Sequence, residues 1–293
     1  MTSIPPLIDL HLHSSASDGT DGPADVVRLA AAAGVTTLAL TDHDTTAGWA
    51  EAAAAVPPGV RLVRGAEFST TSPDGRGGEV PAHLLGYLFD PEHPAVLADQ
   101  QRLRAERRRR IRVMAQRMAD AGYGVDPDEL ETRLDPDAPI GRPHLGRALV
   151  EIGVVGSVGE AFESLLATGG PFYEPKADTP IADAIDTIRA AGGVAVWAHP
   201  WARLRGAVIE PEVIADLAGR GLAGIEVDHR DHAPADRDRL RGLAGDLGLV
   251  VTGSSDYHGE NKTIPIAAET TAPDQLEALL DGATGARVIT GGT

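Results

Sequence analysis

One stretch, residues 8–19, constrains the fold of this chain more than any other. Apolar and polar side chains alternate through 8–13, and His11 and His13 are two of the polar ones. Successive side chains of a β-strand point to opposite faces, so both imidazoles leave the strand on one face. Asp18 follows on a loop rich in Ser and Gly and can fold back beside them. The stretch predicts half of a metal site, although a half-exposed strand with two hydrogen-bonded histidines fits the same pattern.

Short apolar strands alternate with alanine-rich helices along most of the chain. No helix fits between the third and fourth strands, because residues 69–80 are loop-like and hold Pro73 and several glycines. That pair of strands is a candidate hairpin within an α/β fold. The predicted strands are 7–12, 36–41, 61–66, 83–88, 194–198, 224–228, 249–252 and 287–289, and the predicted helices are 23–34, 47–56, 181–191, 211–219, 234–247 and 273–281.

Residues 92–178 differ from the rest of the chain because only helices are predicted there. A long helix is predicted at 95–121, with an apolar seam and a run of arginines over 102–117. Shorter helices are predicted near 127–134, 142–152 and 158–168. The sequence therefore predicts an α/β domain made of 1–91 and 179–293, interrupted by an all-helical domain at 92–178. The arginine run is either a solvated face or a cradle for an oligonucleotide backbone.

Composition excludes several classes of protein. The chain has no cysteine, so disulfides and thiolate–metal sites are excluded. It lacks an apolar run of about 18 residues, and residues 1–6 do not resemble a signal peptide. We therefore expect a cytoplasmic protein without membrane contacts. The formal net charge of -17 disfavours binding to long nucleic-acid duplexes, so an anionic substrate must be attracted locally, for example by bound divalent cations.

Polar residues recur where the predicted strands end. Parallel α/β barrels place their functional residues at the carboxyl ends of the strands. His83 is the exception, since it begins its predicted strand; if that strand is antiparallel, its start lies on the same rim as Glu67. Mixed imidazole and carboxylate ligands favour zinc, manganese or iron over calcium. The residues that end or follow strands are His11, His13, Asp18, His43, Glu67, His199, Asp256 and His258.

Five motifs together resemble those of the polymerase-and-histidinol-phosphatase (PHP) family. The resemblance extends from residue 9 to residue 259, and it implies a distorted (β/α)7 barrel with a trinuclear metal centre. The motifs are His11-Leu12-His13 with Asp18-Gly19, Thr41-Asp42-His43-Asp44, Gly65-Ala66-Glu67, His199-Pro200 and Ser255-Asp256-Tyr257-His258.

The family pattern also implies how the ligands divide among three divalent ions, for which manganese is expected, with zinc or iron as alternatives. Glu67 would bridge the first ion to the second. The first ion would be held by His11, His13, Glu67 and Asp256, the second by Glu67, His83 and His199, and the third by Asp18, His43 and His258.

A motif in the helical segment indicates which branch of the family the chain resembles. Its Gly141-Arg142-Pro143-His144-Leu145 motif resembles the branch that contains 3′,5′-nucleoside bisphosphate phosphatases and 5′→3′ exoribonucleases. The resemblance implies an enzyme that removes the 5′-phosphate from 3′,5′-bisphosphates or trims short RNA from its 5′ end. A hydroxide between two cations would be the nucleophile. The alternatives are a phosphatase for a non-nucleotide ester such as histidinol phosphate, and a catalytically silent, metal-stabilised binding domain.

Four further residues are candidates for contacts with the substrate. Asp42 could supply the proton that the leaving group needs, as could water bound to the metals. Arg142 and His144 lie at a predicted helix start, where backbone N–H groups favour phosphate. Lys176 lies where the helical segment returns to the α/β part. We expect the last three to hold the phosphate that is not cleaved, which makes the helical segment the substrate-recognition domain.

Overall fold

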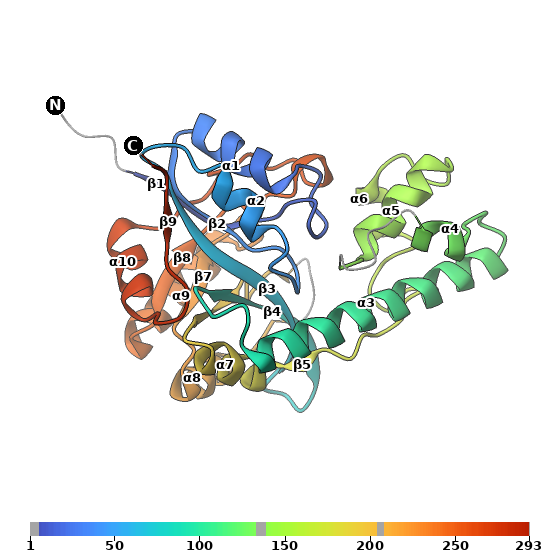
Figure 1. Cartoon of the computed structure of the whole chain (residues 1–293). Helices are drawn as coiled ribbons and strands as arrows, with labels where there is room; N and C mark the ends of the chain where they lie inside the picture. The colour runs from blue at the N-terminus through green and yellow to red at the C-terminus, as the bar shows by residue number, and fades with distance from the viewer. Residues whose placement is uncertain (1–5, 133–138, 204–207, 293) are drawn as a thin grey trace.

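The structure is a computed structural model that describes residues 6–132, 139–203 and 208–292, and it is an α/β fold built on one sheet (Figure 1). The sheet has the order β1-β2-β3-β4-β6-β7-β8, and β5 and β9 pair with β3. The strands are β1 (Leu7–Leu12), β2 (Val35–Leu40), β3 (Arg61–Pro73), β4 (Glu79–Tyr87), β5 (Thr179–Pro180), β6 (Val194–Ala198), β7 (Gly224–Asp228), β8 (Val250–Gly253) and β9 (Ile289–Thr290).

Helices connect the parallel strands, as the alternating pattern predicted. Proline occupies the first turn of at least six of the helices, where its missing N–H and fixed φ suit a helix start. The helices are α1 (Pro23–Ala32), α2 (Trp49–Ala54), α3 (Pro94–Asp120), α4 (Pro127–Thr132), α5 (Arg142–Glu151), α6 (Val158–Glu163), α7 (Ile181–Ala190), α8 (Pro211–Arg220), α9 (Pro234–Leu247) and α10 (Pro273–Asp281). Within the described ranges, none of these is both long and apolar enough to cross a bilayer.

The hairpin of β3 and β4 is confirmed, but the loop predicted at 69–80 is wrong. The strands pair antiparallel through Pro73 and Glu79, which leaves only a short turn between them. The carboxylate of Asp74 closes this turn by accepting hydrogen bonds from the backbone N–H of residues 76 and 78. The Ser and Thr side chains at 69–72 suit a strand, and the nearby Pro and Gly obscured that signal. His83 consequently lies inside β4, opposite Ser69, and not at a strand start.

The two ends of the strand order approach each other beside the candidate ligands. β1, β2 and β3 are mutually parallel, as are β6, β7 and β8, and β4 runs antiparallel to both of its neighbours. An isolated parallel bridge joins Leu12, at the end of β1, to Tyr257, which follows β8. The carboxyl ends of β1, β2, β6, β7 and β8 therefore meet in one region.

The helices α3–α6 lie between β4 and β5 in sequence and extend away from the sheet in Figure 1. They have a hydrophobic cluster of their own, in which Ile111, Met114 and Met118 of α3 pack with Leu145 and Leu149 of α5. The apolar seam predicted for the long helix therefore supports the shorter helices beside it.

Four arginines of α3 bind the segment that returns to the sheet, namely Arg102, Arg109, Arg110 and Arg117. Arg102 donates to the carbonyl of Ala177 at 2.7 Å, and Arg117 donates to that of Tyr173 at 2.7 Å. The carboxylate of Glu174 accepts hydrogen bonds from Arg109 at 2.8 Å and from Arg117 at 2.7 Å. The side chains of Arg102, Arg109 and Arg117 are each 44% exposed, so they lie on a solvated face and also hold residues 173–179 against α3.

Candidate active site

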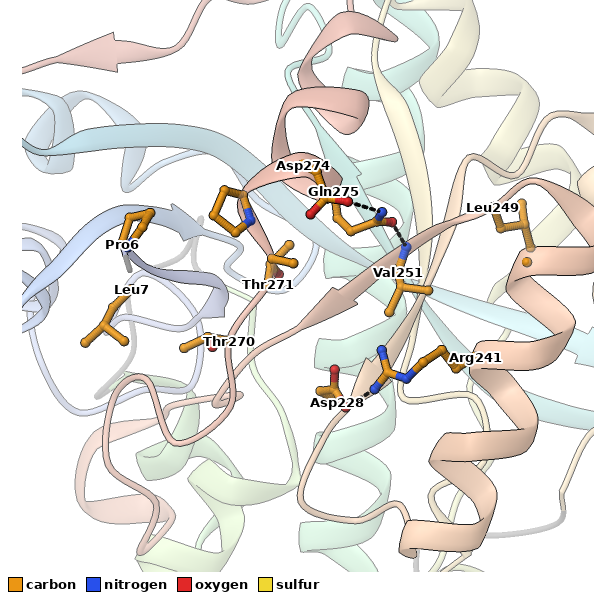
Figure 2. A pocket seen from close by; sticks show the side chains of 13 residues that line it. Pro6, Leu7, Asp228, Arg241, Leu249, Val251, Thr270, Thr271, Asp274 and Gln275 are labelled. Atoms are coloured by element: carbon orange, nitrogen blue, oxygen red, sulfur yellow. Dashed lines mark hydrogen bonds and ion pairs between the residues drawn. The ribbon is translucent and has the colours of Figure 1, made fainter. Parts of the chain in front are cut away.

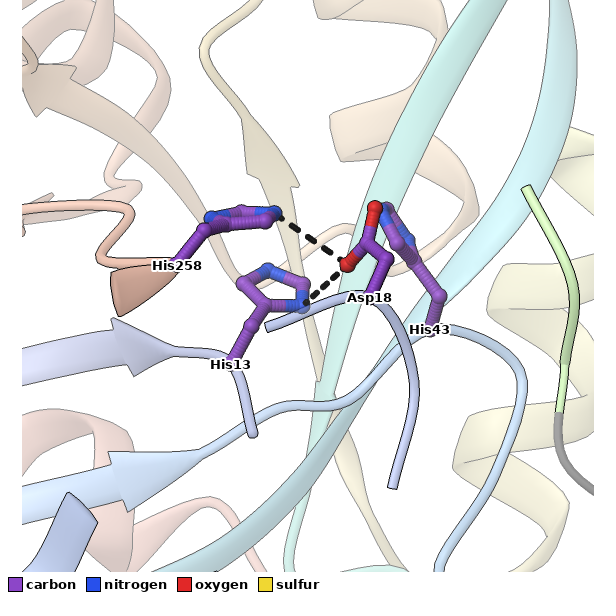
Figure 3. A group of neighbouring side chains, drawn as sticks. All are labelled: His13, Asp18, His43 and His258. Atoms are coloured by element: carbon purple, nitrogen blue, oxygen red, sulfur yellow. Dashed lines mark ion pairs between the residues drawn. The ribbon is translucent and has the colours of Figure 1, made fainter. Parts of the chain in front are cut away.

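Glu67 lies at the centre of a compact cluster of imidazoles and carboxylates. Ligand atoms within 4.8 Å of one another define three overlapping groups. Figure 3 shows the first of them, in which Asp18 lies between His43 and the stacked rings of His13 and His258. The groups are His13, Asp18, His43 and His258; His11, His13, Glu67 and Asp256; and His43, Glu67 and His83.

His199 joins the cluster through Glu67, since its Nε2 lies 3.2 Å from Glu67 Oε1. The nine candidate ligands thus lie together, from strands and loops far apart in sequence. His13 and His43 each belong to two groups, whereas the family pattern assigned each of them to a single ion. The expected sharing of Glu67 agrees with its place in two groups.

The backbone is strained where three of these loops leave the sheet. Asp44, His199 and Asp256 have φ of 50°, 33° and 53°. Non-glycine residues adopt such conformations rarely, and they do so where surrounding contacts impose them. The strain therefore coincides with the loops that aim the candidate ligands.

The cluster fits divalent metal ions by its own chemistry. His13 Nδ1, Asp18 Oδ1, His43 Nδ1, Glu67 Oε2 and His83 Nδ1 are buried and have no hydrogen-bond partner among the described residues. Buried polar atoms without partners cost free energy, and native proteins rarely keep several together. Coordination to a cation would satisfy these atoms.

The charges in the cluster favour the same conclusion. Burial raises the pKa of Glu67, but the imidazoles of His83, His11 and His43 outweigh burial and hold the pKa well below its usual range. Burial lowers the pKa of His13, which favours the neutral form of its imidazole. An ionised carboxylate and a neutral imidazole are the forms that bind metal.

Glu226 is a buried residue that the sequence analysis missed. Its Oε1 lies 3.2 Å from His11 Nδ1 and accepts a hydrogen bond from Ser254 Oγ, and its Oε2 accepts the backbone N–H of His199 at 2.9 Å. This carboxylate turns His11 Nε2 toward Glu67, 3.1 Å away, in the way that a carboxylate orients a metal-binding histidine. The only signal in the sequence was an acidic residue between the apolar residues of β7.

Asp42 is buried and holds the loop that carries Asp18. It accepts hydrogen bonds from the N–H of Ser14 at 2.8 Å, from Ser14 Oγ at 2.7 Å and from Ser17 Oγ at 2.6 Å. Burial raises the pKa of Asp42, although these bonds oppose the shift. Both carboxylate oxygens are engaged, so the geometry of Asp42 is that of a residue that positions a loop.

Asp9 anchors the loop after β8 in the same way. Its carboxylate accepts the N–H of Ser255 at 3.1 Å, Ser255 Oγ at 2.6 Å and the N–H of Ala267 at 2.8 Å. These bonds fix the backbone directly before Asp256. Asp9 lies two residues before His11 on β1, so one face of this strand supplies both a ligand candidate and an anchor for another.

Lys262 was also missed by the sequence analysis. Its Nζ lies 2.6 Å from Asp256 Oδ2, and His229 Nε2 lies 3.4 Å from the same oxygen. His11 and His13 both approach the other oxygen, Oδ1, at 3.6 Å. The two oxygens of Asp256 are therefore used differently, one toward the cluster and one toward a cation of the chain.

The helical segment reaches the cluster through Arg107. Its Nε lies 2.5 Å from Asp44 Oδ2, and its Nη2 donates to Ser69 Oγ at 2.8 Å. Asp44 also accepts the N–H and the Oγ–H of Ser69, at 2.7 and 2.8 Å. Asp44 follows His43, and Ser69 lies two residues from Glu67, so this buried network touches both ligand-bearing segments.

The three predicted substrate contacts have partners within the protein. Arg142 Nη1 donates to the carbonyl of Leu166 at 2.9 Å, and burial lowers the pKa of Arg142 to about 10. His144 Nδ1 accepts the N–H of Gly141 at 3.1 Å, and burial lowers the pKa of His144 to about 4.

Lys176 forms an ion pair with Asp178. Burial lowers the pKa of Lys176 to about 8, and the charge of Arg107 acts in the same direction. At neutral pH, Arg142 and Lys176 are therefore cations, whereas His144 is uncharged.

A separate cavity of about 610 Å³ lies between β8 and the start of α10 (Figure 2). Its polar groups are mutually paired: Arg241 donates to Asp228 at 2.7 Å, and Gln275 Oε1 accepts the N–H of Val251 at 2.8 Å. None of the nine ligand candidates lines it. This cavity is therefore separate from the cluster around Glu67.

Known proteins resemble this chain over most of its length. The PHP domain model matches residues 9–118. A 3′,5′-nucleoside bisphosphate phosphatase of Chromobacterium violaceum is 36% identical, over 86% of this chain and 87% of that protein. The chain belongs to the PHP family. A 5′-3′ exoribonuclease of Haemophilus influenzae is also 36% identical, over 85% of this chain and 89% of that protein.

Solved structures agree with this membership. A protein of Bifidobacterium adolescentis described as a metal-dependent phosphoesterase superposes with a TM-score of 0.89 and 31% identity, over 96% of this chain and 98% of that one. A Chromobacterium violaceum protein described as an amidohydrolase with bound sulfate has a TM-score of 0.80 and 31% identity, over 95% and 97%. The PHP-family chain described here is a metal-dependent phosphoesterase, and the non-catalytic alternative is not favoured.

Proposed function

We propose that this enzyme hydrolyses phosphate esters of 3′,5′-nucleoside bisphosphates and of short RNA at the cluster around Glu67. The observation that carries the proposal is the set of buried ligand atoms that converge there without hydrogen-bond partners among the described residues. Relatives named as a bisphosphate phosphatase and as an exoribonuclease are equally similar to this chain and support both substrates.

One register of binding would serve both substrates. A 5′→3′ exonuclease attacks the phosphorus on the 3′ side of the first nucleotide, whichever of its ester bonds breaks. A bisphosphate bound in the same register loses its 3′-phosphate and keeps its 5′-phosphate. A shared register therefore favours cleavage of the 3′-phosphate over the 5′ cleavage expected from the sequence, and the identity of the nucleotide product distinguishes the two.

The proposed ligands are the nine side chains of the cluster, with one divalent ion for each of the three groups. Manganese is the proposed metal, with zinc or iron as alternatives, since imidazole and carboxylate donors without sulfur suit all three. Such ions supply an activated water and neutralise the charge of the phosphate. The proposed ligands are His11, His13, Asp18, His43, Glu67, His83, His199, Asp256 and His258.

The chain's own residues would organise this centre. Glu226 and Lys262 orient His11 and Asp256 through the bonds described above. Asp42, with its three bonds to Ser14 and Ser17, is proposed as a positioning residue for Asp18 and not as the proton donor.

We further propose that residues 1–91 and 179–293 form a distorted (β/α)7 barrel and that 92–178 form the domain that recognises substrate. The bridge between Leu12 and Tyr257, which brings the ends of the strand order together, supports the barrel. The separate hydrophobic cluster of α3–α6 supports the inserted domain. Arg142, His144 and Lys176 remain the proposed contacts to the phosphate that is not cleaved.

A phosphate-release assay with manganese tests the proposal. The substrates are an adenosine 3′,5′-bisphosphate, adenosine 5′-phosphate, a short 5′-phosphorylated RNA, phosphoribosyl 1,2-cyclic phosphate and histidinol phosphate. We expect the highest kcat/KM for the bisphosphate and the RNA, with adenosine 5′-phosphate as a product of the former. A preference for histidinol phosphate or the cyclic phosphate would reject nucleotides as the substrate class.

The variant Asp256→Asn, measured beside the surface variant Asp246→Asn, assigns the activity to the cluster. Asp256 belongs to a ligand group, whereas Asp246 lies on α9. Turnover by Asp256→Asn at the wild-type rate would contradict the proposed site.

A further inference from the structure

Two arginines of the helical segment share one aromatic ring. The guanidinium carbon of Arg110, on α3, lies 5.1 Å from the ring centroid of Tyr173, and that of Arg142, on α5, lies 5.9 Å from it. Arg142 also lies over Phe162 at 5.1 Å. A ring face attracts cations and fixes the planar guanidinium beside it. Both guanidinium groups therefore lie against the ring of Tyr173.

These two arginines differ from their neighbours in their partners. Arg109, Arg112 and Arg117 each form an ion pair with a carboxylate. Arg110 instead donates from Nε to the carbonyl of Glu174 at 2.8 Å, and Arg142 donates from Nη1 to the carbonyl of Leu166 and to Thr168 Oγ1.

Among the described residues, neither Arg110 nor Arg142 has a carboxylate within ion-pair distance. Within the same residues, no acceptor binds the two Nη atoms of Arg110, and none binds Nε or Nη2 of Arg142. Burial lowers the pKa of both, and the charge of Arg110 lowers that of Arg142 further. Two partly buried cations, of which Arg110 lowers the affinity of Arg142 for a proton, each with guanidinium nitrogens that lack an acceptor there, are a site that an anion would stabilise.

The pair is continuous with the metal-binding cluster. Arg107 lies one turn of α3 before Arg110 and binds Asp44, the residue after His43. Arg107 also lies close to Gly141, since a Cβ added to that glycine would be 3.4 Å from Arg107 Nη1. Gly141 directly precedes Arg142. Cationic side chains thus lead from the cluster to the pair, in a chain whose net charge is -17.

We propose that Arg110 and Arg142, held by Tyr173, form the subsite for the terminal phosphate that is not cleaved, an inference that rests on the proposed function. Arg110 and Tyr173 are the new members of this subsite. A phosphate monoester carries about two negative charges near neutral pH and presents several oxygens to two guanidinium forks. The subsite therefore selects nucleotides with a 5′-phosphate over those with a 5′-hydroxyl.

Binding of adenosine 5′-phosphate to the manganese-loaded enzyme, measured by calorimetric titration, tests the subsite. Arg110→Met should weaken this binding about tenfold or more, the effect of losing a hydrogen bond to a charged group. Arg112→Met is the matched control, since it removes the same charge from the same helix but from a pair with Asp128 and Glu131. Adenosine, which lacks the phosphate, should bind both variants equally.

Equal nucleotide affinity of the two variants would overturn the subsite. Arg110→Lys keeps the charge without the fork and should fall between wild type and Arg110→Met, so the inference stays testable if the methionine variant does not fold. Tyr173→Phe keeps the ring and should retain affinity, whereas Tyr173→Leu should lose it. A purely structural role for Arg110 would lower the affinity for adenosine and for the nucleotide alike.

Kinetics separates this inference from the proposed function. The ratio of kcat/KM for the bisphosphate to that for an aryl phosphate should fall in Arg110→Met and stay at the wild-type value in Arg112→Met. Arginine-dependent binding of the nucleotide without hydrolysis of the bisphosphate would reject the proposed function alone. Hydrolysis with an unchanged ratio in Arg110→Met would reject the subsite alone.

Discussion

Replacing Arg107 by methionine tests whether the helical segment is built into the metal site. Arg107 and Asp44 form a buried ion pair at 2.5 Å, and the side chain of Asp44 is completely inaccessible. Methionine keeps much of the side-chain volume but removes the guanidinium. The carboxylate of Asp44 would then keep only its hydrogen bonds with Ser69.

The expected loss of stability is about 3–5 kcal/mol, because removing one partner of a buried ion pair leaves an uncompensated charge. Burial raises the pKa of Asp44, but Arg107 and Lys176 outweigh burial and hold it well below its usual range. In the wild type this stabilisation is present above the unfolded-state pKa of about 3.9 and is lost as pH falls through the folded-state pKa. The loss in free energy of unfolding caused by Arg107→Met should be complete at pH 7. It should become smaller toward pH 4, where the unpaired carboxyl group of Asp44 takes up a proton.

Urea unfolding followed by far-UV circular dichroism, at a fixed saturating manganese concentration, measures this loss. Asp44→Asn and the double variant complete a mutant cycle. The double variant should lose less free energy of unfolding than the sum of the losses in the two single variants. Arg112→Met, on the exposed face of α3, should unfold like the wild type. An Arg107→Met midpoint equal to that of this control, or additive losses in the cycle, would refute the coupling.

Three further outcomes are expected. Glu226→Gln should weaken metal affinity about 10–100-fold in a chelator competition, because His11 loses its orienting carboxylate, whereas Asp228→Asn on the same strand should not. Chelation should lower Tm, and elemental analysis after reconstitution should find one divalent ion for each of the three ligand groups; an unchanged Tm and no bound ion would reject them. Because the pKa of Lys176 is lowered to about 8, its charge is present below that pH, so kcat/KM for the bisphosphate should fall as pH rises through about 8. Lys176→Arg should abolish the decline in kcat/KM. If the decline persists in this variant, it arises from the titration of another group.

The local pattern predicted most elements because their signals are short-range. Alternating polarity marked β1, and proline at the first helical turn marked the starts of α1, α8 and α9. The extent of β3 was wrong, since its outer half is polar and is stabilised by pairing with β4, a partner that local propensity does not reveal.

The ligand candidates were recognisable because metal chemistry restricts residue types at strand ends, and the topology then brings those ends together. Their supporting residues were not recognisable. Glu226 and Lys262 read as an ordinary acidic and an ordinary basic residue until the structure puts them beside His11 and Asp256.

The sequence by itself determined the alternation of strands and helices, the helical segment within it and the identity of the candidate ligands. Only the tertiary structure decided which side chains share an oxygen of Glu67, and which arginines of α3 are paired with carboxylates and which are not. The physical reason is range: periodicity and capping act over a few residues, whereas ion pairs and metal groups join atoms whose residues lie up to hundreds of positions apart and whose separation the packing of the whole sheet sets.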